Sequence, residues 1–518
     1  MKDFSILIAG KAGFGIDKAG MILAAILNQL GFRIYIYRDY PSLIRGGHTF
    51  SIIRASEKRI SVHSDKVNFI LALNQEAVDL HKKRLKKNAK IIFDSTVVKS
   101  KGTGIAISGI IQEEKASEIM RNTCIIGSFC KVAGIDWNIL DEVFRKNIDK
   151  ELDMNLKIAR RGFDAAQTEI NIRPIAQEAM PLVTGNEAIG LGLVNAGLKA
   201  YIAYPMTPSS GILHFMASNA QSFGLKVVHP ESEISVMLMS LGFAYAGQKC
   251  AVGTSGGGFC LMAEGLSFSG QANLPAVIVL GQRPGPSTGL PTYTAQTELN
   301  FAMSAGQGEF SRFITAPADP EDAYYWSGIA MNLSWKYFIP SIILTDKTLA
   351  EGVFNFDINS IVKINEENPA SWQNGLIKKA ISYEHDQAGI TTQEMRMNKE
   401  KFLVKELEKY ECVKTFGNKK SKDALLCWGS NKGVCVEVAE KLNLRAIQVS
   451  VIWPLPKAQL VKSLSGTRQV ICVENNSTAQ FSRLCSSNGI KITQNILKYD
   501  GRPFSVEELE KAAKGILK

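Results

Sequence analysis

Short apolar runs alternate with stretches of helical periodicity along the first third of the chain. Residues 4–10 form a continuous apolar run, a glycine-rich turn follows at 10–16, and apolar positions recur at helical spacing over 19–30. Further strands are predicted at 33–37, 69–73 and 90–93, and further helices near 114–121 and 139–144. An unbroken apolar run is typical of a strand that is buried on both faces of a parallel sheet. The pattern therefore predicts one α/β domain that extends to about residue 165.

The alternation resumes after residues 166–182, a stretch that lacks a clean period and carries Pro174 and Pro181. Small and apolar residues predict a helix over 185–197, and a largely apolar helix is predicted over 231–247. The strands predicted in this region lie at 198–203, 227–228, 249–254, 276–280 and 341–345. Strands that alternate with helices in this way indicate a second α/β domain with a parallel sheet.

Residues 351–401 are polar and are predicted to be irregular. A third α/β unit follows them, with strands at 424–428, 446–451 and 470–474. A helix that ends at Leu442 lies between the first two of these strands, and an amphipathic helix follows a turn at 499–504.

Three strands of the middle region end in turns that are rich in glycine, proline and hydroxyl residues. The turns are Y-P-M-T-P-S-S at 204–210, T-S-G-G-G-F at 254–259 and G-Q-R-P-G-P-S-T-G at 281–289. Pro205 and Pro208 fix φ and cannot donate to a sheet, so the chain must leave its strand there. Thr207, Ser209 and Ser210 stand where a loop meets the next helix, and each is suited to cap it.

The carboxyl ends of parallel strands meet at one edge of a sheet, and open α/β sheets bind ligands at that edge. The three turns are therefore expected to lie together. Glu231 and Glu233 open the helix that follows the strand at 227–228, and they belong to the same edge. Carboxylates near a helix N-terminus usually lie at the surface and complement the helix dipole. Because most residues after Glu233 are apolar or small, we expect this helix to be buried and a carboxylate at its mouth to face a pocket.

The first turn, G-K-A-G-F-G at 10–15, joins a strand to a helix, an arrangement that lets backbone amides approach a phosphate. Its glycines, Gly10, Gly13 and Gly15, have the reverse of the dinucleotide spacing, which disfavours a nicotinamide site. A ligand loop and a purely structural turn both remain open. Arg38 and Arg45, the latter before a glycine pair, are suited to hold an acidic or phosphorylated ligand.

Composition narrows the classes of function. The 518 residues are 45% hydrophobic and 21% charged, and no apolar run reaches the ~18 residues of a membrane helix. The amino terminus carries no signal-peptide pattern. The nine cysteines are dispersed and none forms a C-x-x-C pair, so we predict reduced thiols, no metal site in this chain and a cytoplasmic protein. The net charge of +11 comes from lysines spread along the chain without an aromatic platform, which disfavours nucleic acid as the partner.

The motifs together resemble those of the 2-oxoacid:ferredoxin oxidoreductases, in particular the 2-oxoglutarate enzymes. The family's order is kept by Y-P-M-T-P-S-S, E-S-E-I, T-S-G-G-G-F, Q-R-P-G-P-S-T-G-L-P-T, E-H-D-Q-A-G at 384–389, W-G-S, E-N-N and Y-D-G-R-P-F. The resemblance implies a fused chain whose first ~170 residues are similar to a γ subunit and whose remainder is similar to an α subunit. It also implies an enzyme of anaerobic metabolism.

The resemblance implies an α/β fold of three domains. A Rossmann-like γ domain is expected over 1–170 and, after a linker at 171–182, a doubly wound domain of the thiamin pyrimidine-binding type over 183–355. A second linker is expected over 356–400, and an α/β domain similar to the transketolase carboxyl-terminal domain over 401–518.

Members of the family decarboxylate a 2-oxoacid on thiamin diphosphate, reduce ferredoxin and acylate coenzyme A. By motif position, Glu233 would bind the thiamin pyrimidine, where a partly desolvated carboxylate best promotes tautomerisation. Arg283 would clamp the substrate carboxylate, and Thr207 would offer a hydroxyl to the substrate or to the developing charge. Tyr204 and Pro205 would complete the substrate site. The family's coenzyme A is assigned to the first domain, at the glycine turn, Arg38 and Arg45.

The chain lacks the G-D-G…N signature that holds Mg²⁺ and diphosphate, and it lacks clustered cysteines. A β subunit is therefore expected to share thiamin diphosphate with Mg²⁺ and to carry the iron–sulfur (4Fe-4S) cluster, which implies a hetero-oligomer. Two departures from the family pattern are the triple glycine at 256–258 in place of G-P-G and Gln307 in place of a common histidine.

Several alternatives stay open. The preferred acid is expected to be 2-oxoglutarate by analogy alone, with pyruvate, 2-oxoisovalerate and indolepyruvate as competitors. A non-catalytic scaffold that docks a β subunit is a second hypothesis. A transketolase-like thiamin enzyme that needs no ferredoxin is a third, which the missing diphosphate signature opposes.

Overall fold

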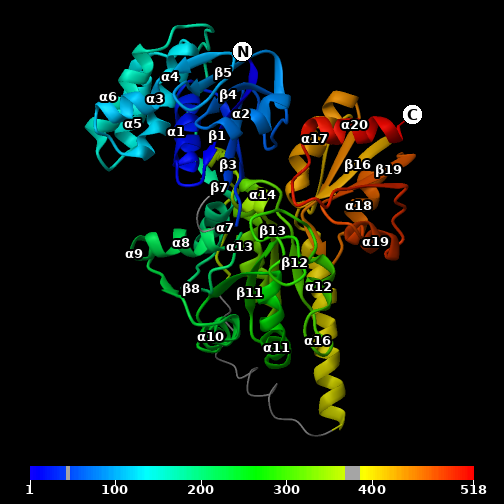
Figure 1. Ribbon diagram of the computed structural model, residues 1–518. Coiled ribbons are helices and arrows are strands. Elements are labelled where there is room, and N and C mark those ends of the chain that lie inside the picture. Colours follow the sequence, from blue (N-terminus) through cyan, green and yellow to red (C-terminus); the bar gives the residue numbers. More distant parts are fainter. Residues whose placement is uncertain (43–46, 368–385, 518) are drawn as a thin grey trace. The chain divides into compact units, whose positions relative to one another are not determined.

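The computed structural model of the protein describes residues 1–42, 47–367 and 386–517. The chain forms two compact units, and Figure 1 traces their elements along the sequence. The first unit comprises Met1–Leu182, Gly352–Phe356 and Ser505–Glu507. The second comprises Val183–Glu351, Asp357–Phe504 and Glu508–Lys518. Strands and helices alternate in both units, and the strands form sheets of eight, seven and five, so the predicted α/β class is confirmed.

The sheet of the first unit has the order β6-β5-β4-β1-β3-β2-β14-β7. Its strands are β1 (Asp3–Lys11), β2 (Arg33–Asp39), β3 (His48–Ser56), β4 (Val67–Ala72), β5 (Leu85–Asp94), β6 (Thr103–Ile105), β7 (Leu182–Thr184) and β14 (Val353–Asn355). The expectation that β1 lies in a parallel sheet is only half correct, since β1 pairs in parallel with β4 but antiparallel with β3. No strand was predicted at the position of β3, which follows β2 after a short connection, as antiparallel neighbours do.

The described part of the first unit has six α-helices. They are α1 (Ile16–Gln29), α2 (Gln75–His81), α3 (Ile107–Glu113), α4 (Arg121–Val132), α5 (Trp137–Asn147) and α6 (Leu152–Asp164). Of these, α1, α2 and α4 contact the sheet, while α6 packs on α4. The helix predicted at 114–121 is wrong. Lys115 has a φ of +51°, and the amide of Ala116 donates to the carbonyl of Ile111, which ends α3 in a left-handed cap. A short 3-10 turn, Glu118–Met120, then leads into α4.

The seven-stranded sheet of the second unit has the order β18-β12-β13-β11-β10-β8-β9. Its strands are β8 (Ala200–Ala203), β9 (Lys226–Val228), β10 (Cys250–Ser255), β11 (Ala276–Gln282), β12 (Phe313–Thr315), β13 (Pro340–Asp346) and β18 (Val451–Trp453). All neighbours pair in parallel except β12 and β18. β8, β10 and β11 are adjacent, so the three predicted turns follow neighbouring strands of one parallel sheet.

The helices of this region are α7 (Gly185–Asn195), α8 (Ser210–Ser218), α9 (Ala220–Phe223), α10 (Glu233–Tyr245), α11 (Gly256–Ala272), α12 (Leu299–Ser304), α13 (Pro320–Tyr337) and α14 (Lys347–Ala350). A capping box starts α7, because the Thr184 hydroxyl accepts from the Glu187 amide and the Glu187 carboxylate accepts from the Thr184 amide. α7 packs on α13, and the would-be Cβ of Gly192 points into the backbone of Tyr324, so only glycine permits this approach.

The five-stranded sheet has the order β15-β17-β16-β19-β20. Its strands are β15 (Val413–Gly417), β16 (Asp423–Trp428), β17 (Arg445–Val449), β19 (Gln469–Glu474) and β20 (Gln494–Leu497), and its helices are α17 (Lys432–Leu442), α18 (Lys457–Leu464), α19 (Gln480–Ser487) and α20 (Val506–Ile516). The single strand predicted at 446–451 is wrong. β17 ends at Val449, and β18 pairs antiparallel with β12 of the neighbouring sheet. Ser450 makes the crossing: its amide donates to the carbonyl of Cys412, and its own carbonyl accepts from the amide of Ala316.

The expectation that residues 351–401 are irregular is also wrong in part, because α16 spans Asp386–Leu407. Lys399, on this helix, donates to Phe338 O over 2.9 Å and to Asn273 Oδ1 over 2.5 Å. Burial lowers the pKa of Lys399 to about 8. Contacts with residues far along the chain therefore fix a helix whose own sequence has no strong apolar stripe.

Candidate active site

The loop after β8 is held rigidly against the neighbouring strands. Ser209 is buried and donates its hydroxyl to Met206 O (2.9 Å) and Thr254 O (3.0 Å), so it locks the loop to the end of β10 instead of capping α8. The side-chain amide of Asn186, on α7, donates to Pro208 O over 2.9 Å. Thr207 itself stays partly exposed. The backbone of this loop is therefore fixed while the Thr207 side chain can meet a ligand.

Arg283 extends from the end of β11 to this loop. Its Nη1 donates to Thr207 O over 2.9 Å, which places the two residues in direct contact. The side chain is 6% exposed, and burial lowers the pKa of the guanidinium. Its Nε is buried and has no hydrogen-bond partner within the described part of the chain. A buried donor without an acceptor costs free energy, about 1–3 kcal/mol, which an anionic ligand would recover.

Glu233 and Glu231 lie in different surroundings although only Ser232 separates them. Glu233 is the first residue of α10 and is 5% exposed. Glu231 precedes the helix, is exposed and accepts from the Ser235 hydroxyl, which lowers its pKa. The Oε1 of Glu233 lies directly against Cα of Gly258, so that a Cβ at position 258 would collide with it. The buried carboxylate thus faces the first turn of α11.

The first turn of α11 also meets Arg283's loop. A Cβ added to Gly257 would lie 3.6 Å from Ser287 O and 3.9 Å from Met206 Cε, so the three strand-end loops converge on this turn. The loop 284–290 is itself closed by a hydrogen bond of 2.9 Å from the amide of Leu290 to Pro284 O. Tyr204 stays 37% exposed and packs edge-on against His229 with ring centroids 5.8 Å apart. The neighbouring Pro205 is exposed.

A second buried carboxyl group, which was not predicted from the sequence, lies beside the first turn of α11. Glu298 is 8% exposed, and its Oε1 would be 2.5 Å from a Cβ on Gly256. Burial raises the pKa of Glu298 to about 7, against the opposing effects of a hydrogen bond from Thr297 and the charge of Arg283. No motif marked this residue, because its position depends on how the segment 292–298 folds back onto β11.

Gln296 explains that fold. It is fully buried, and its side chain donates to Trp428 O (3.0 Å) and accepts from Asn431 Nδ2 (2.8 Å) and the Asn475 amide (2.9 Å). Asn476 Nδ2 donates to Gln296 O over 3.0 Å. The W-G-S and E-N-N motifs thus surround one side chain. They hold the segment that carries Glu298 at the site.

The predicted site residues of the first unit are only partly brought together. Gly15 is the left-handed N-cap of α1, and Asn122 Nδ2 donates to its carbonyl over 3.2 Å. Arg38 lies at the same helix end, because its Nε is 2.5 Å from Oδ1 of Asp17. In the turn itself the amides of Ala12 and Phe14 already donate to Gly47 O and Lys11 O.

Two other glycines of this turn differ in their surroundings. Gly10 lies within β1 beside Phe14, whereas no atom of the described residues lies within 4 Å of a Cβ added to Gly13. Arg45 is outside the described residues, as are Glu384 and His385 of the E-H-D-Q-A-G motif.

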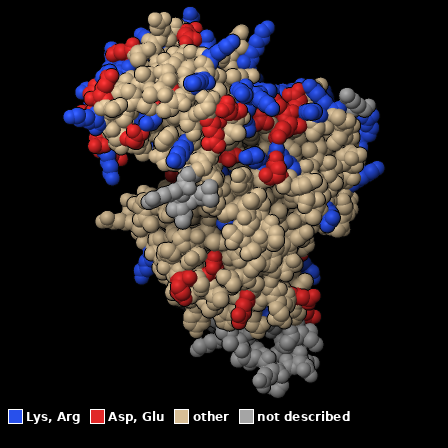
Figure 2. Space-filling view, in the orientation of Figure 1, with Lys and Arg blue, Asp and Glu red and all other residues tan. Residues whose placement is uncertain are grey.

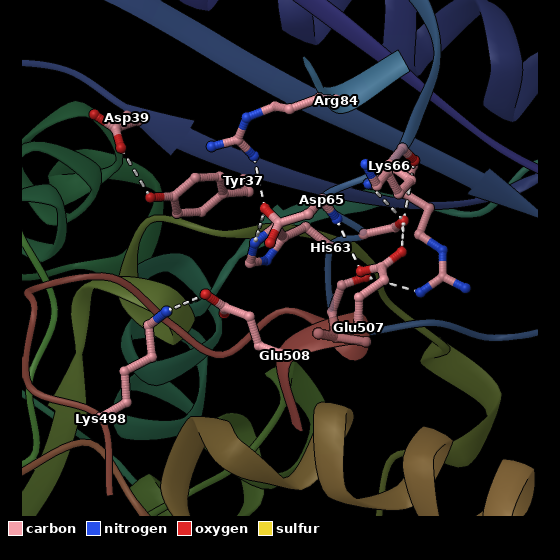
Figure 3. A network of polar contacts seen from close by, with 12 residues as sticks. Tyr37, Asp39, His63, Asp65, Lys66, Arg84, Lys498, Glu507 and Glu508 are labelled. Atoms are coloured by element: carbon pink, nitrogen blue, oxygen red, sulfur yellow. Dashed lines mark hydrogen bonds and ion pairs between the residues drawn. The ribbon is translucent and has the colours of Figure 1, made fainter. Parts of the chain in front are cut away.

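Further polar contacts of the first unit surround the end of β2 (Figure 3). Tyr37 donates its hydroxyl to Asp39 over 3.1 Å and stacks on His63 with ring centroids 4.6 Å apart. Arg84 pairs with Asp65 over 2.6 Å. Glu507, which belongs to this unit, accepts from the amide of Asp65 over 3.0 Å. The network joins short segments that are far apart in sequence.

The remaining features narrow the chemistry. Among residues 1–42, 47–367 and 386–517, no group of three or more His, Cys, Asp or Glu side chains is arranged to hold a metal ion. Within the same residues no helix is both long and apolar enough to span a membrane. Gln307 is exposed, and its backbone amide donates a hydrogen bond to the Ser267 hydroxyl oxygen. Ser267 lies in the second half of α11, away from the first turn of that helix.

In the second unit these residues lie at the carboxyl ends of β8, β10 and β11, which is the edge where open α/β sheets bind ligands. Two family models match the chain in sequence. Residues 5–165 match a model described as pyruvate ferredoxin/flavodoxin oxidoreductase, and residues 192–413 match the thiamine diphosphate-binding model of pyruvate flavodoxin/ferredoxin oxidoreductases.

Some known proteins align with nearly the whole chain and others with a part of it. The α subunit of a 2-oxoacid:ferredoxin oxidoreductase from Sulfolobus sp. is 28% identical, with 99% of this chain and 97% of that protein covered. The 2-oxoglutarate synthase subunit KorA of Archaeoglobus fulgidus is 37% identical over 168 residues, which are 32% of this chain and 49% of that protein. The solved 2-oxoglutarate:ferredoxin oxidoreductase of Magnetococcus marinus, with 2-oxoglutarate, coenzyme A and succinyl-CoA bound, covers 100% of both chains at 25% identity and a TM-score of 0.89. The chain belongs to the family of 2-oxoacid:ferredoxin oxidoreductase α subunits.

Proposed function

We propose that this chain, with a β subunit, catalyses the coenzyme A-dependent oxidative decarboxylation of a 2-oxoacid. The 2-oxoacid, coenzyme A and two oxidised ferredoxins would give acyl-CoA, CO₂, a proton and two reduced ferredoxins. The observation that carries the proposal is that a buried arginine and a buried glutamate, Arg283 and Glu233, belong to segments that meet at the first turn of α11. One residue suits a carboxylate substrate and the other suits the pyrimidine of the cofactor.

Glu233 fits the pyrimidine site on its own chemistry. When bound, thiamin diphosphate supplies a carbanion at C2, and this requires its pyrimidine as the imino tautomer. A carboxylate that is 5% exposed and fixed by the start of a helix can hold the proton shared with the ring nitrogen. The exposed Glu231, which accepts from Ser235, lacks this desolvation.

Arg283 fits a substrate carboxylate for a complementary reason. Its Nη1 is engaged by Thr207 O, while its buried Nε has no acceptor among the described residues. The guanidinium would orient the acid beside the Thr207 hydroxyl, with Tyr204 and Pro205 at the rim of the site. Thr207 would donate a hydrogen bond to the oxygen on which charge develops.

The incompleteness of this site supports a partner subunit. α10 and α11 pack closely at Gly265, which would place a Cβ 2.5 Å from Met237 Cγ. Their outer faces carry large exposed apolar side chains, namely Ile234, Leu238, Met239, Tyr245, Leu261 and Phe268. Figure 2 has mainly uncharged surface over these two helices, interrupted by a few acidic side chains.

This apolar face starts at the residue next to Glu233, so a subunit that covered it would also close the site. Contiguous exposed apolar surface of this kind marks protein interfaces. The β subunit would bring the Mg²⁺–diphosphate site and the iron–sulfur cluster, for which this chain offers no motif. Leu238→Glu should therefore prevent co-purification with β, while Leu80→Glu, at an exposed leucine of the first unit, should not.

The first unit is proposed to bind coenzyme A through Arg38, the glycine turn and Arg45. Arg38 stands at the N-terminus of α1, where phosphate groups are favoured. We propose 2-oxoglutarate as the preferred acid because the Magnetococcus marinus protein, which covers the whole chain, was solved with 2-oxoglutarate bound. Pyruvate, 2-oxoisovalerate and indolepyruvate are the competitors to be tested.

The test is reconstitution of the chain with its β subunit, thiamin diphosphate, Mg²⁺ and coenzyme A, followed by viologen reduction with each acid in parallel. Coenzyme A-dependent reduction that is greatest with 2-oxoglutarate and is lost in Glu233→Gln is the expected result. A stable complex that reduces viologen with none of the acids would contradict the proposal and favour a scaffold. Turnover that survives Arg283→Ala would contradict the substrate-clamp role.

A further inference from the structure

Glu298 is a buried carboxyl group beside the first turn of α11 to which the proposed reaction gives no part. It is 8% exposed, and its carboxyl group accepts hydrogen bonds from Thr297, from the hydroxyl over 2.7 Å and from the backbone amide. These hydrogen bonds do not offset the loss of water around a buried carboxylate, whereas the protonated form tolerates such a place. A group of this kind is either a defect of the fold or an adjustable element of the site.

Its anchoring ties Glu298 to Arg283. The backbone amide of Glu298 donates to Gln282 Oε1 over 3.3 Å, and the Thr297 hydroxyl that contacts Glu298 also lies 3.2 Å from Arg283 O. Glu298 is thus attached to Gln282 through its own amide and to the backbone of Arg283 through Thr297. The carboxyl group and the guanidinium attract one another but form no direct ion pair within the described residues. Arg283 keeps its buried Nε available.

The groups that face Glu298 come from four places. The end of β11 contributes Gln282 and the cationic Arg283, and the first turn of α11 contributes Gly256. From α19, Gln480 Nε2 donates to Thr297 O, and Gln480 Oε1 accepts from the backbone amide of Asn300, two residues after Glu298. The carboxylate of Glu233 lies two residues along the same turn of α11, against Gly258. Arg283 is therefore the one cation near Glu298 in the described chain.

We propose that Glu298 is a positioning residue for Arg283, and that its protonation state sets how strongly the guanidinium attracts a carboxylate ligand. Protonated Glu298 leaves the full positive charge of Arg283 to the ligand. Ionised Glu298 competes for the same charge and repels an incoming anion. The inference rests on the proposed role of Arg283 as the substrate clamp.

The pH dependence follows from the sign of the coupling. Burial raises the pKa of Glu298 to about 7, so the group loses its proton near neutral pH in the ligand-free protein. A bound carboxylate disfavours that ionisation, and by linkage the acid must bind more weakly as Glu298 ionises. A coupling of about one pKa unit corresponds to a change of ~10-fold in affinity. Proton uptake upon acid binding is expected between pH 6 and pH 8.

The experiment uses the reconstituted complex and measures KM and kcat for the preferred acid from pH 6 to pH 8. For the wild type, KM should rise by about three- to tenfold over this range. Glu298→Gln, which mimics the protonated form, should keep a low KM that does not change with pH, with kcat within about threefold of wild type. Glu309→Gln, at an exposed glutamate, should behave as the wild type.

A Glu298→Gln variant whose KM rises with pH as in the wild type would overturn the proposal. So would a KM that is pH-independent in the wild type itself. If Glu298→Gln does not assemble, isothermal titration of the wild-type complex in phosphate and in Tris buffer decides. Equal binding enthalpies in the two buffers would mean no proton uptake and would equally overturn it.

One arm separates this inference from the proposed reaction. Infrared difference spectra of the full chain between pH 6 and pH 8 should contain a carboxyl C=O band that is absent in Glu298→Gln. In Arg283→Gln this band should persist to higher pH, because the cation that favours the ionised carboxylate is gone. If no acid is turned over but the band behaves in this way, the proposed reaction fails while the coupling stands. If the band is absent from the wild type, the coupling fails irrespective of turnover.

Discussion

At the strand ends of the second unit, Arg283 and Glu233 are buried, at 6% and 5% exposure, and Arg283 has a donor without an acceptor in the described chain. At the glycine turn of the first unit, Arg38 is already paired with Asp17, whose side chain is 65% exposed. Burying a charge without a full set of partners is costly, so a fold retains it where a ligand or a partner completes the set. A surface ion pair carries no such implication, since it is worth ~0–1 kcal/mol and is easily exchanged.

The two proposed sites are therefore supported by different kinds of evidence. The site of the second unit follows from the energetics of its own residues. The coenzyme A site of the first unit follows from position, because Arg38 and the start of α1 are adjacent. Substitutions at the strand-end site of the second unit should therefore have large effects. Those at the proposed coenzyme A site of the first unit should have modest effects that depend on coenzyme A.

The largest effect is expected for Glu233→Gln. The amide cannot hold the proton that the pyrimidine shares with the carboxylate, so kcat should fall by roughly 10²–10⁴-fold. Steady-state viologen reduction by the reconstituted complex measures the loss. Glu231→Gln, at the exposed neighbour, is the matched control and should retain wild-type turnover. Equal losses in both variants would place the effect at the helix end and not at the buried carboxylate.

A smaller but still large effect is expected for Gly258→Ala. The new methyl group would collide with Glu233 Oε1 and Thr254 Oγ1 and push the carboxylate from its place. A displacement of this kind should reduce kcat by about 10- to 100-fold while the complex still assembles. In Gly257→Ala the methyl group would have its nearest neighbour 3.6 Å away, so we expect turnover within about threefold of wild type. A variant at 258 with normal turnover would show that Glu233 need not occupy its observed position.

The strand-end loops were predictable from the sequence because their signals are local. Proline, glycine and hydroxyl residues at the end of each apolar run place Thr207 and Arg283 in loops at one edge of the sheet. They follow β8 and β11, which are separated by β10 alone, and Arg283 reaches Thr207 O across the end of β10. The buried state of Glu233 was likewise indicated by the apolar residues that follow it. The features that could not be predicted depend on contacts with residues far along the chain.

Gln296 shows the limit most clearly. Its partners Trp428, Asn431 and Asn475 lie more than a hundred residues away, and no periodicity links them. Glu298 depends on that anchorage, so it was missed as well. The same reason applies to Ser450, whose carbonyl accepts from Ala316, and explains why one predicted strand serves two sheets. Motifs of unknown role, such as E-N-N, were the only available hint of this network.

In the first unit, Arg38→Ala should raise the KM for coenzyme A by about three- to tenfold, as expected for the loss of one partly exposed charge-assisted contact. The KM for the 2-oxoacid should not change. Arg145→Ala, at an arginine in an exposed ion pair on α5, is the control and should leave both constants unchanged. If Arg38→Ala alters neither constant, coenzyme A binds elsewhere, and the asymmetry between the two units becomes complete.

The smallest effect is expected for Gly13→Ala, and it separates a ligand loop from a structural turn. Gly13 has a φ of +99° and Gly224, in the second unit, has a φ of +63°, and neither would bring a Cβ within 4 Å of an atom of the described chain. Alanine should thus cost about 1 kcal/mol of backbone strain at either position, measurable as a similar fall in Tm. Only Gly13→Ala should also raise the KM for coenzyme A, by about two- to threefold, because the empty space beside it would hold part of the ligand. Equal KM values in the two variants would mean that this glycine serves the turn alone, and that the first unit contacts coenzyme A through Arg38 without the loop.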